Sequence, residues 1–168
     1  HKPDRRQRQM CIRDRAVTAA GGEVRKAQKS HIGIANEITL NHEGLKNLIY
    51  KNKDQKFNSP AFNFDEVVKL PKNGICLASN KVNNIQSIYF TVGDTKIWGL
   101  QYHPEITYEK MISLIEFRKD KLINNRKAFK NEDEVKKQIL FIKDEIPVSN
   151  KAQRMIELKN WLDNISYN

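Results

Sequence analysis

Cysteine is scarce in this sequence, and the two cysteines present stand far apart. Cys11 and Cys76 form no disulfide framework and show no zinc-site spacing. The four histidines stand at no metal-ligand spacing to cysteines or carboxylates. These absences argue against a disulfide-stabilised secreted scaffold, and they predict that no metal is bound.

Long apolar runs and glycine-rich loops are also missing. No stretch is apolar over the roughly 20 residues that a membrane helix needs, and no apolar segment of the signal-peptide kind occurs. The sequence therefore predicts a soluble, cytoplasmic protein without a membrane anchor. Because no glycine-rich phosphate-binding loop is present, we expect no ATP binding and no cofactor.

What the sequence has in excess is positive charge, +10 over 168 residues. Residues 1–15 contribute +4, from six basic and two acidic side chains, and the remaining +6 is lysine mixed with glutamate and aspartate. No arginines alternate with aromatic residues as in proteins that stack bases. Nucleic acid is therefore not the expected partner, and the 39% hydrophobic content is enough for one core.

The strongest chemical candidate lies where a predicted strand ends, in the segment GLQYHPE, 99–105. The run 96–102 is rich in β-branched, aromatic and aliphatic residues, which favours a strand. Pro104 restricts the residue before it to an extended conformation. Side chains two apart on an extended chain point the same way, so the Glu105 carboxylate can reach the His103 ring. Such a pair suits a nucleophile's base, although a surface pair has the same spacing.

The segment from Trp98 to Glu105 resembles the His-x-Glu motif of class I (triad-type) glutamine amidotransferases, and in particular the stand-alone branch similar to GMP synthase. The resemblance runs from about residue 16 to about residue 106, and more weakly to the C-terminus. It implies an α/β fold, here the C-terminal part of the family's flavodoxin-like domain, followed by a helical segment.

That resemblance also implies an activity. A Cys-His-Glu triad, with His103 and Glu105 as catalytic residues, would hydrolyse the glutamine amide through a thioester and deliver ammonia to a synthetase partner. Cleavage of γ-glutamyl substrates by the same thioester is an alternative in the same branch. A pseudoenzyme or interaction protein of the same fold is the non-enzymatic alternative.

The nucleophile of this triad has no recognisable position. In the family it stands in a Gly-x-Cys-x-Gly-x-Gln turn, followed by a helix and a Gly-Gly pair. The segment 16–22 resembles the end of that helix, and counting back from Gly21 places the nucleophile at about Met10. The neighbouring Cys11 is only a weak candidate, because the residues around it do not fit the turn. We therefore expect the chain as given to be inactive.

Two further segments bear on the same site. The segment GICLAS, 74–79, is similar to the nucleophile turn, but its second glycine is replaced by alanine, so Cys76 is predicted to be a buried strand cysteine. The segment 57–71 resembles the family's His-x-Asp-x-Val motif before Leu-Pro. Asp65 fits that motif, whereas Asn63 stands in place of its histidine, and a loop between strands is an equal alternative.

The sequence divides into three parts. Residues 1–15 form a basic tail without apolar periodicity that is expected to pack against nothing, and it resembles a translation artefact, a natural disordered arm being the alternative. Residues 16–106 are the partial amidotransferase domain, and 107–168 form a helical C-terminal segment. On this division we expect the chain to be a fragment of a longer reading frame.

Within these parts, strands are expected over 23–29, 32–40, 85–92 and 94–102, and helices over 107–122, 132–143 and 150–165. His31 and His42 have no partner pattern, so both are expected at the surface or in loops.

Overall fold

The computed structural model describes residues 12–165; residues 1–11, and Cys11 with them, lie outside this part, as do residues 166–168. The described elements are α1 (Ile12–Ala19), β1 (Glu23–Leu40), α2 (His42–Lys46), the 3₁₀ turn η2 (Leu48–Tyr50), β2 (Lys56–Lys69), β3 (Ile75–Ser79), β4 (Ser87–Val92), β5 (Thr95–Leu100), α3 (Tyr108–Phe117), the π-helical turn η3 (Lys121–Asn125), α4 (Glu132–Glu145), α5 (Lys151–Arg154) and α6 (Ile156–Ile165).

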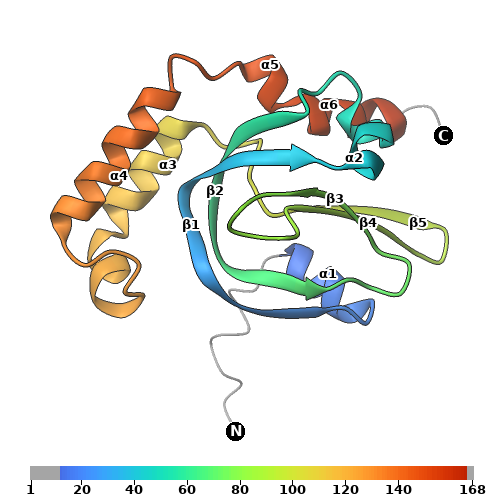
Figure 1. Cartoon of the computed structure of the whole chain (residues 1–168), viewed down its shortest axis with the longest axis horizontal. Coiled ribbons are helices and arrows are strands. Elements are labelled where there is room, and N and C mark those ends of the chain that lie inside the picture. Colours follow the sequence, from blue (N-terminus) through green and yellow to red (C-terminus); the bar gives the residue numbers. More distant parts are fainter. Residues whose placement is uncertain (1–11, 166–168) are drawn as a thin grey trace, which may run out of the picture.

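The strands form one antiparallel sheet in the order β2-β1-β3-β4-β5. The long strands β1 and β2 pair along most of their length and curl around the shorter β3, β4 and β5 (Figure 1). β1 meets β3 only through Thr39 and Leu40. The sheet therefore has two parts, a curved β1–β2 ribbon and a β3–β4–β5 meander, which meet over a short ladder.

The segment 23–40 is one strand, so the prediction of two strands joined by a turn is wrong. The turn is replaced by an irregular register with β2 between Lys26 and His31, which an extended chain can absorb without breaking. His31 itself is buried opposite Asn63 and its Nε2 lies 2.9 Å from Gln86 Nε2, which corrects its expected surface position. Asn63 accordingly lies in a strand and not in a loop. His42, by contrast, is exposed.

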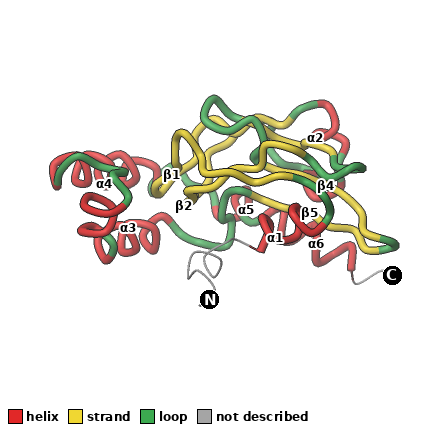
Figure 2. Tube along the Cα trace, turned by 90° about the horizontal axis from the view of Figure 1, so that it is seen from below, coloured by secondary structure: helices red, strands yellow, loops and turns green. Residues whose placement is uncertain are grey.

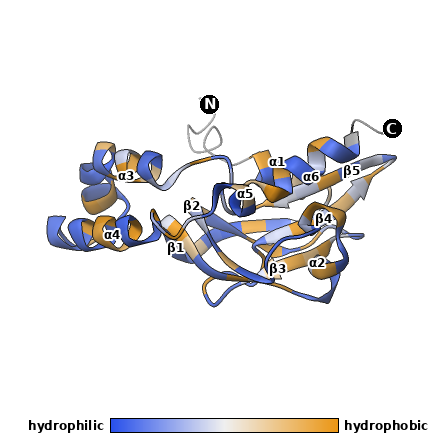
Figure 3. Cartoon of the chain, turned by 90° about the horizontal axis from the view of Figure 1, so that it is seen from above, coloured by the Kyte–Doolittle hydropathy of each residue, from blue (hydrophilic) through white to orange (hydrophobic). Residues whose placement is uncertain are grey.

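Helices α3 and α4 pack together against the curved ribbon of β1 and β2 (Figure 2). The Thr107 side chain caps α3, and the Asn131 side chain caps α4. Their apolar residues gather in one cluster with β1: Ile32, Ile34, Tyr108, Ile112, Ile115, Leu122, Val135 and Ile142. The remaining faces of both helices are mixed, with hydrophilic residues beside exposed apolar ones such as Phe117 and Leu140 (Figure 3). The predicted helix 107–122 is interrupted after Phe117, which is exposed rather than part of the apolar face.

The first described helix corrects the expectation for the basic tail. Arg13 and Asp14 are buried and form an ion pair with each other, so residues 1–15 do not as a whole avoid the folded body. Ile12 remains 77% exposed. The helix ends as the sequence predicts, since Gly21 adopts a φ of +85° just after it. In the described part of the chain, no helix has the length and apolar character needed to cross a membrane.

Gly33 is the position where the β1–helix packing tolerates no side chain. Its φ is +100°, and an added Cβ would lie 2.2 Å from Ile142 Cδ1 and 2.9 Å from Ile115 Cδ1. We expect Gly33→Ala to lower the free energy of unfolding by about 2–4 kcal/mol, because strain and overpacking add. Gly93→Ala is the matched control: its φ is +55° and nothing lies within 4 Å of the added Cβ, so about 1–2 kcal/mol should be lost. Urea unfolding followed by circular dichroism measures both, and equal losses would contradict this account.

Candidate functional site

His103 and Glu105 lie in a tight turn directly after β5. The Ile106 N–H donates to the His103 carbonyl at 3.1 Å, which closes a four-residue turn with Pro104 in second position. His103 Nδ1 lies 2.9 Å from Glu105 Oε1. The two side chains thus meet as expected, although across a turn rather than along an extended strand, because β5 ends at Leu100.

The geometry of this pair fixes the histidine tautomer. With Nδ1–H donating to the carboxylate, Nε2 is the ring nitrogen left to take up a proton. The His103 side chain is 32% exposed and that of Glu105 51%, so both can be reached from solvent. Partial burial pushes the pKa of Glu105 upward, but the hydrogen bond from His103 and the positive charges of His103 and Arg154 outweigh it, so this pKa lies below its usual value.

Three hydrogen bonds to backbone carbonyls hold the turn in place. The His103 N–H donates to the Pro60 carbonyl at 2.7 Å, which fastens the turn to β2. From the C-terminal segment, Arg154 Nη1 donates to the Pro104 carbonyl at 3.0 Å and also to the Ile106 carbonyl. The turn is therefore held between β2 and the end of α5. No sequence pattern links Arg154 to this turn, so sequence analysis missed it.

Tyr102, the residue before His103, is anchored by a buried polar network. Its hydroxyl donates to Glu157 Oε1 at 2.7 Å and lies 2.8 Å from the Tyr50 hydroxyl. Lys53 Nζ forms an ion pair with Glu157 Oε2 at 3.0 Å, and both side chains are almost fully buried. Burial raises the pKa of Glu157 and lowers that of Lys53, because each charge has lost its water. The network joins η2, the β5 end and α6, and sequence analysis missed it too.

Two side-chain amides, one from β2 and one from the residue after β5, meet at the backbone carbonyl of Asp65. Asn63 Nδ2 and Gln101 Nε2 donate to the Asp65 carbonyl, at 3.3 Å and 2.9 Å. Two effects raise the pKa of the Asp65 carboxyl: burial is the larger, and the nearby negative charge of Asp14 is the smaller. Within the described residues, the buried Oδ1 of Asn63 and Oε1 of Gln101 have no hydrogen-bond partner. Gln101 thus links β2 to the strand end that leads to His103, whereas the Asn63 contact stays within β2.

Cys76 lies in β3, as predicted, and has the properties of a structural cysteine. It is half-buried, burial raises the pKa of its thiol, and Sγ contacts the Ala78 carbonyl at 3.4 Å. Its strand leads to no nucleophile turn, and residues 12–165 include no other cysteine. The same range contains no group of three or more His, Cys, Asp or Glu side chains arranged to hold a metal.

Comparison with known proteins identifies the relatives of this chain. The sequence model of glutamine amidotransferase class-I matches residues 15–119. A "Gamma-glutamyl-L-1-hydroxyisopropylamide hydrolase" of Pseudomonas sp is 27% identical over 169 residues, which cover 89% of this chain and 57% of that protein. The "GMP synthase [glutamine-hydrolyzing]" of Borrelia garinii subsp. bavariensis is 39% identical over 94 residues, 56% of this chain and 17% of that enzyme. The chain thus spans little more than half of one curated relative and a sixth of the other.

Solved structures confirm the expected fold. A glutamine amidotransferase from Thermotoga maritima superposes with a TM-score of 0.59 at 17% identity, covering 88% of this chain and 56% of that chain. One from Methylobacillus flagellatus gives 0.56 at 14% identity, covering 88% and 59%. Together with the family match, they confirm the resemblance and the α/β fold class that the sequence indicated.

The lowered pKa of Glu105 yields a pH prediction. Its carboxyl should titrate below the usual 4.5, and His103→Ala should raise its pKa, because the hydrogen bond and charge of the histidine are lost. Since the pKa of Glu105 is lower in the folded protein than in the unfolded chain, its ionised carboxylate stabilises the fold. This stabilisation is fully present above the unfolded-state pKa and is lost as the pH falls through the folded-state pKa. A ¹³C NMR titration of the Glu105 carboxyl measures its pKa in the unchanged chain and in His103→Ala. His42→Ala is the control, because His42 pairs with Glu43 instead, and a Glu105 pKa unmoved by His103→Ala would contradict the pairing.

The buried ion pair yields a stability prediction. Lys53→Met should lower the free energy of unfolding by about 3–5 kcal/mol, since it leaves the Glu157 charge buried without its cation. Lys159→Met, which breaks the exposed pair with Asp163, should cost no more than about 1 kcal/mol. The second change Glu157→Leu should recover most of the loss in Lys53→Met. Chemical denaturation measures all three, and similar losses for the two single variants would refute the role of burial.

Proposed function

Since this chain belongs to the glutamine amidotransferase class I family, we propose that His103 and Glu105 are two members of a Cys-His-Glu triad that hydrolyses the side-chain amide of glutamine. The observation that carries the proposal is the 2.9 Å contact between His103 Nδ1 and Glu105 Oε1, in a turn held from two sides. This contact leaves Nε2 of the partly exposed His103 ring free to take the proton of a nucleophile.

In the proposed reaction, Nε2 of His103 takes the proton of a cysteine thiol as its sulfur attacks the amide carbon. The imidazolium then gives this proton to the amide nitrogen, the C–N bond breaks, and ammonia leaves a γ-glutamyl thioester. Water, deprotonated by the same Nε2, cleaves the thioester to release glutamate and restore the thiol. Glu105 keeps Nδ1 protonated and stabilises the imidazolium in both halves. We propose that the ammonia passes to a synthetase partner.

The chain as given should lack this activity, because residues 12–165 supply no thiol of the required kind. Cys76 is a strand cysteine with a raised thiol pKa, so little of it is the reactive thiolate at neutral pH. A His–Glu pair without a thiolate cannot form the thioester. Cys11, outside the described residues, stays a weak candidate on the sequence alone.

A second candidate is hydrolysis of γ-glutamyl amides with an amine other than ammonia as the leaving group. The Pseudomonas relative, whose name states such a reaction, matches 89% of this chain, and this must include most of residues 107–168. The GMP synthase of Borrelia garinii matches only 56%. The same residues would act in the same order, and only the group on the amide nitrogen differs.

Ammonia release from L-glutamine and amine release from γ-glutamyl-p-nitroanilide test these proposals. The 168-residue chain should turn over neither compound, and activity that disappears in Cys11→Ala would contradict the proposed inactivity. A longer product in which this chain follows a nucleophile turn of the family should hydrolyse at least one. There, His103→Ala should lower kcat by about 10²–10⁴-fold with little change in KM. His42→Ala is the control. Activity insensitive to His103→Ala, or no activity in that longer product, would favour an interaction protein.

A further inference from the structure

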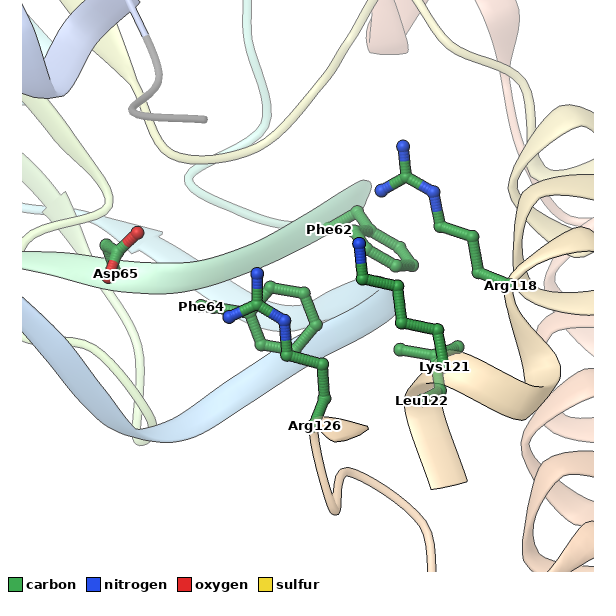
Figure 4. A pocket seen from close by; sticks show the side chains of 7 residues that line it. All are labelled: Phe62, Phe64, Asp65, Arg118, Lys121, Leu122 and Arg126. Atoms are coloured by element: carbon green, nitrogen blue, oxygen red, sulfur yellow. The ribbon is translucent and has the colours of Figure 1, made fainter. Parts of the chain in front are cut away.

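A cavity of about 310 Å³ lies between β2 and the segment that follows α3 (Figure 4). Strand β2 contributes two phenylalanines and a carboxylate, and the segment 118–126 contributes a leucine and three cations. The lining residues are Phe62, Phe64, Asp65, Arg118, Lys121, Leu122 and Arg126. The volume is at the lower end of the range for small-molecule pockets.

Two of the cations are oriented by the phenylalanines. The guanidinium of Arg118 lies 5.4 Å from the ring centroid of Phe62, and that of Arg126 lies 4.7 Å from that of Phe64. Such cation–π contacts restrict the guanidinium planes, and at Arg118 the contact leaves the N–H edge available. Figure 4 shows Arg118, Lys121 and Arg126 all extending from the helical side toward β2.

Arg118 and Lys121 are exposed residues that line this cavity. One carboxylate, that of Asp65, also lines it, and burial raises the pKa of this group. Among the ion pairs formed within residues 12–165, none involves Arg118 or Lys121. Both charges can therefore be reached by a dissolved anion, beside apolar walls formed by the two rings and Leu122. An arginine can hold a carboxylate or phosphate through two parallel hydrogen bonds.

From these observations we propose that the cavity binds a small organic or inorganic anion through a carboxylate or phosphate group, with Arg118 and Lys121 as its principal partners. The site lies near the His–Glu turn: Phe62 is two residues along β2 from Pro60, whose carbonyl accepts the His103 N–H. Two strand residues span about 7 Å. The cavity and the turn thus share β2 as a support, while neither His103 nor Glu105 lines the cavity. Binding needs no nucleophile, so it goes beyond the proposed function and does not fail with it.

Isothermal titration calorimetry at low ionic strength tests the proposal with two probes, succinate and inorganic phosphate. The 168-residue chain should bind at least one of them saturably, and the preferred probe identifies the group that the site accepts. The double variant Arg118→Gln/Lys121→Gln should weaken this binding at least tenfold. The control Lys96→Gln/Lys137→Gln removes the same charge from exposed residues outside the cavity, and it should change the affinity less than twofold.

A more conservative variant separates geometry from charge. Arg118→Lys keeps the positive charge but loses the planar fork, so it should weaken binding by an intermediate amount. If circular dichroism shows the double variant to be unfolded, the affinity of Arg118→Lys tests the proposal in its place. Binding of neither probe, equal weakening in the cavity and control variants, or unchanged affinity in Arg118→Lys when the double variant is unfolded would each overturn the proposal.

Discussion

The candidate site depends on one buried ion pair, between Lys53 and Glu157. Both charges have been taken out of water, so neither would be stable there without the other, and Glu157 also accepts the hydroxyl of Tyr102. Because Tyr102 directly precedes His103, the pair fixes the start of the turn that carries the proposed base. Arg154, four residues after the helix cap Asn150, fixes the other end of the turn through backbone carbonyls.

The proposed chemistry and the neighbouring cavity share one strand. β2 accepts the His103 N–H through Pro60 and presents Phe62 and Phe64 to the cations of the helical segment. On the same strand, the Asp65 carbonyl accepts hydrogen bonds from the side-chain amides of Asn63, also in β2, and of Gln101, just after β5. The curvature of the β1–β2 ribbon brings these contacts together, because it turns one face of β2 toward the helices.

Sequence reasoning succeeded where the signal is local. The His-Pro-Glu spacing and the apolar period of α3 and α4 each concern residues within a few positions of one another. It failed where a distant contact decides the outcome. His31 is polar, and only its place opposite Asn63 in the β1–β2 ladder explains its burial. The partners Lys53 and Glu157 are 104 residues apart, and no spacing rule connects them.

That separation has a consequence for the order in which the chain folds. Contacts between residues so far apart form only after the intervening chain has closed a long loop, which is slow and entropically costly. During synthesis, Glu157 is added 55 residues after Tyr102, so β5 and the His103 turn leave the ribosome before it does. The turn therefore acquires its final support last, so the proposed base becomes rigid at the end of folding and not when its own strand forms.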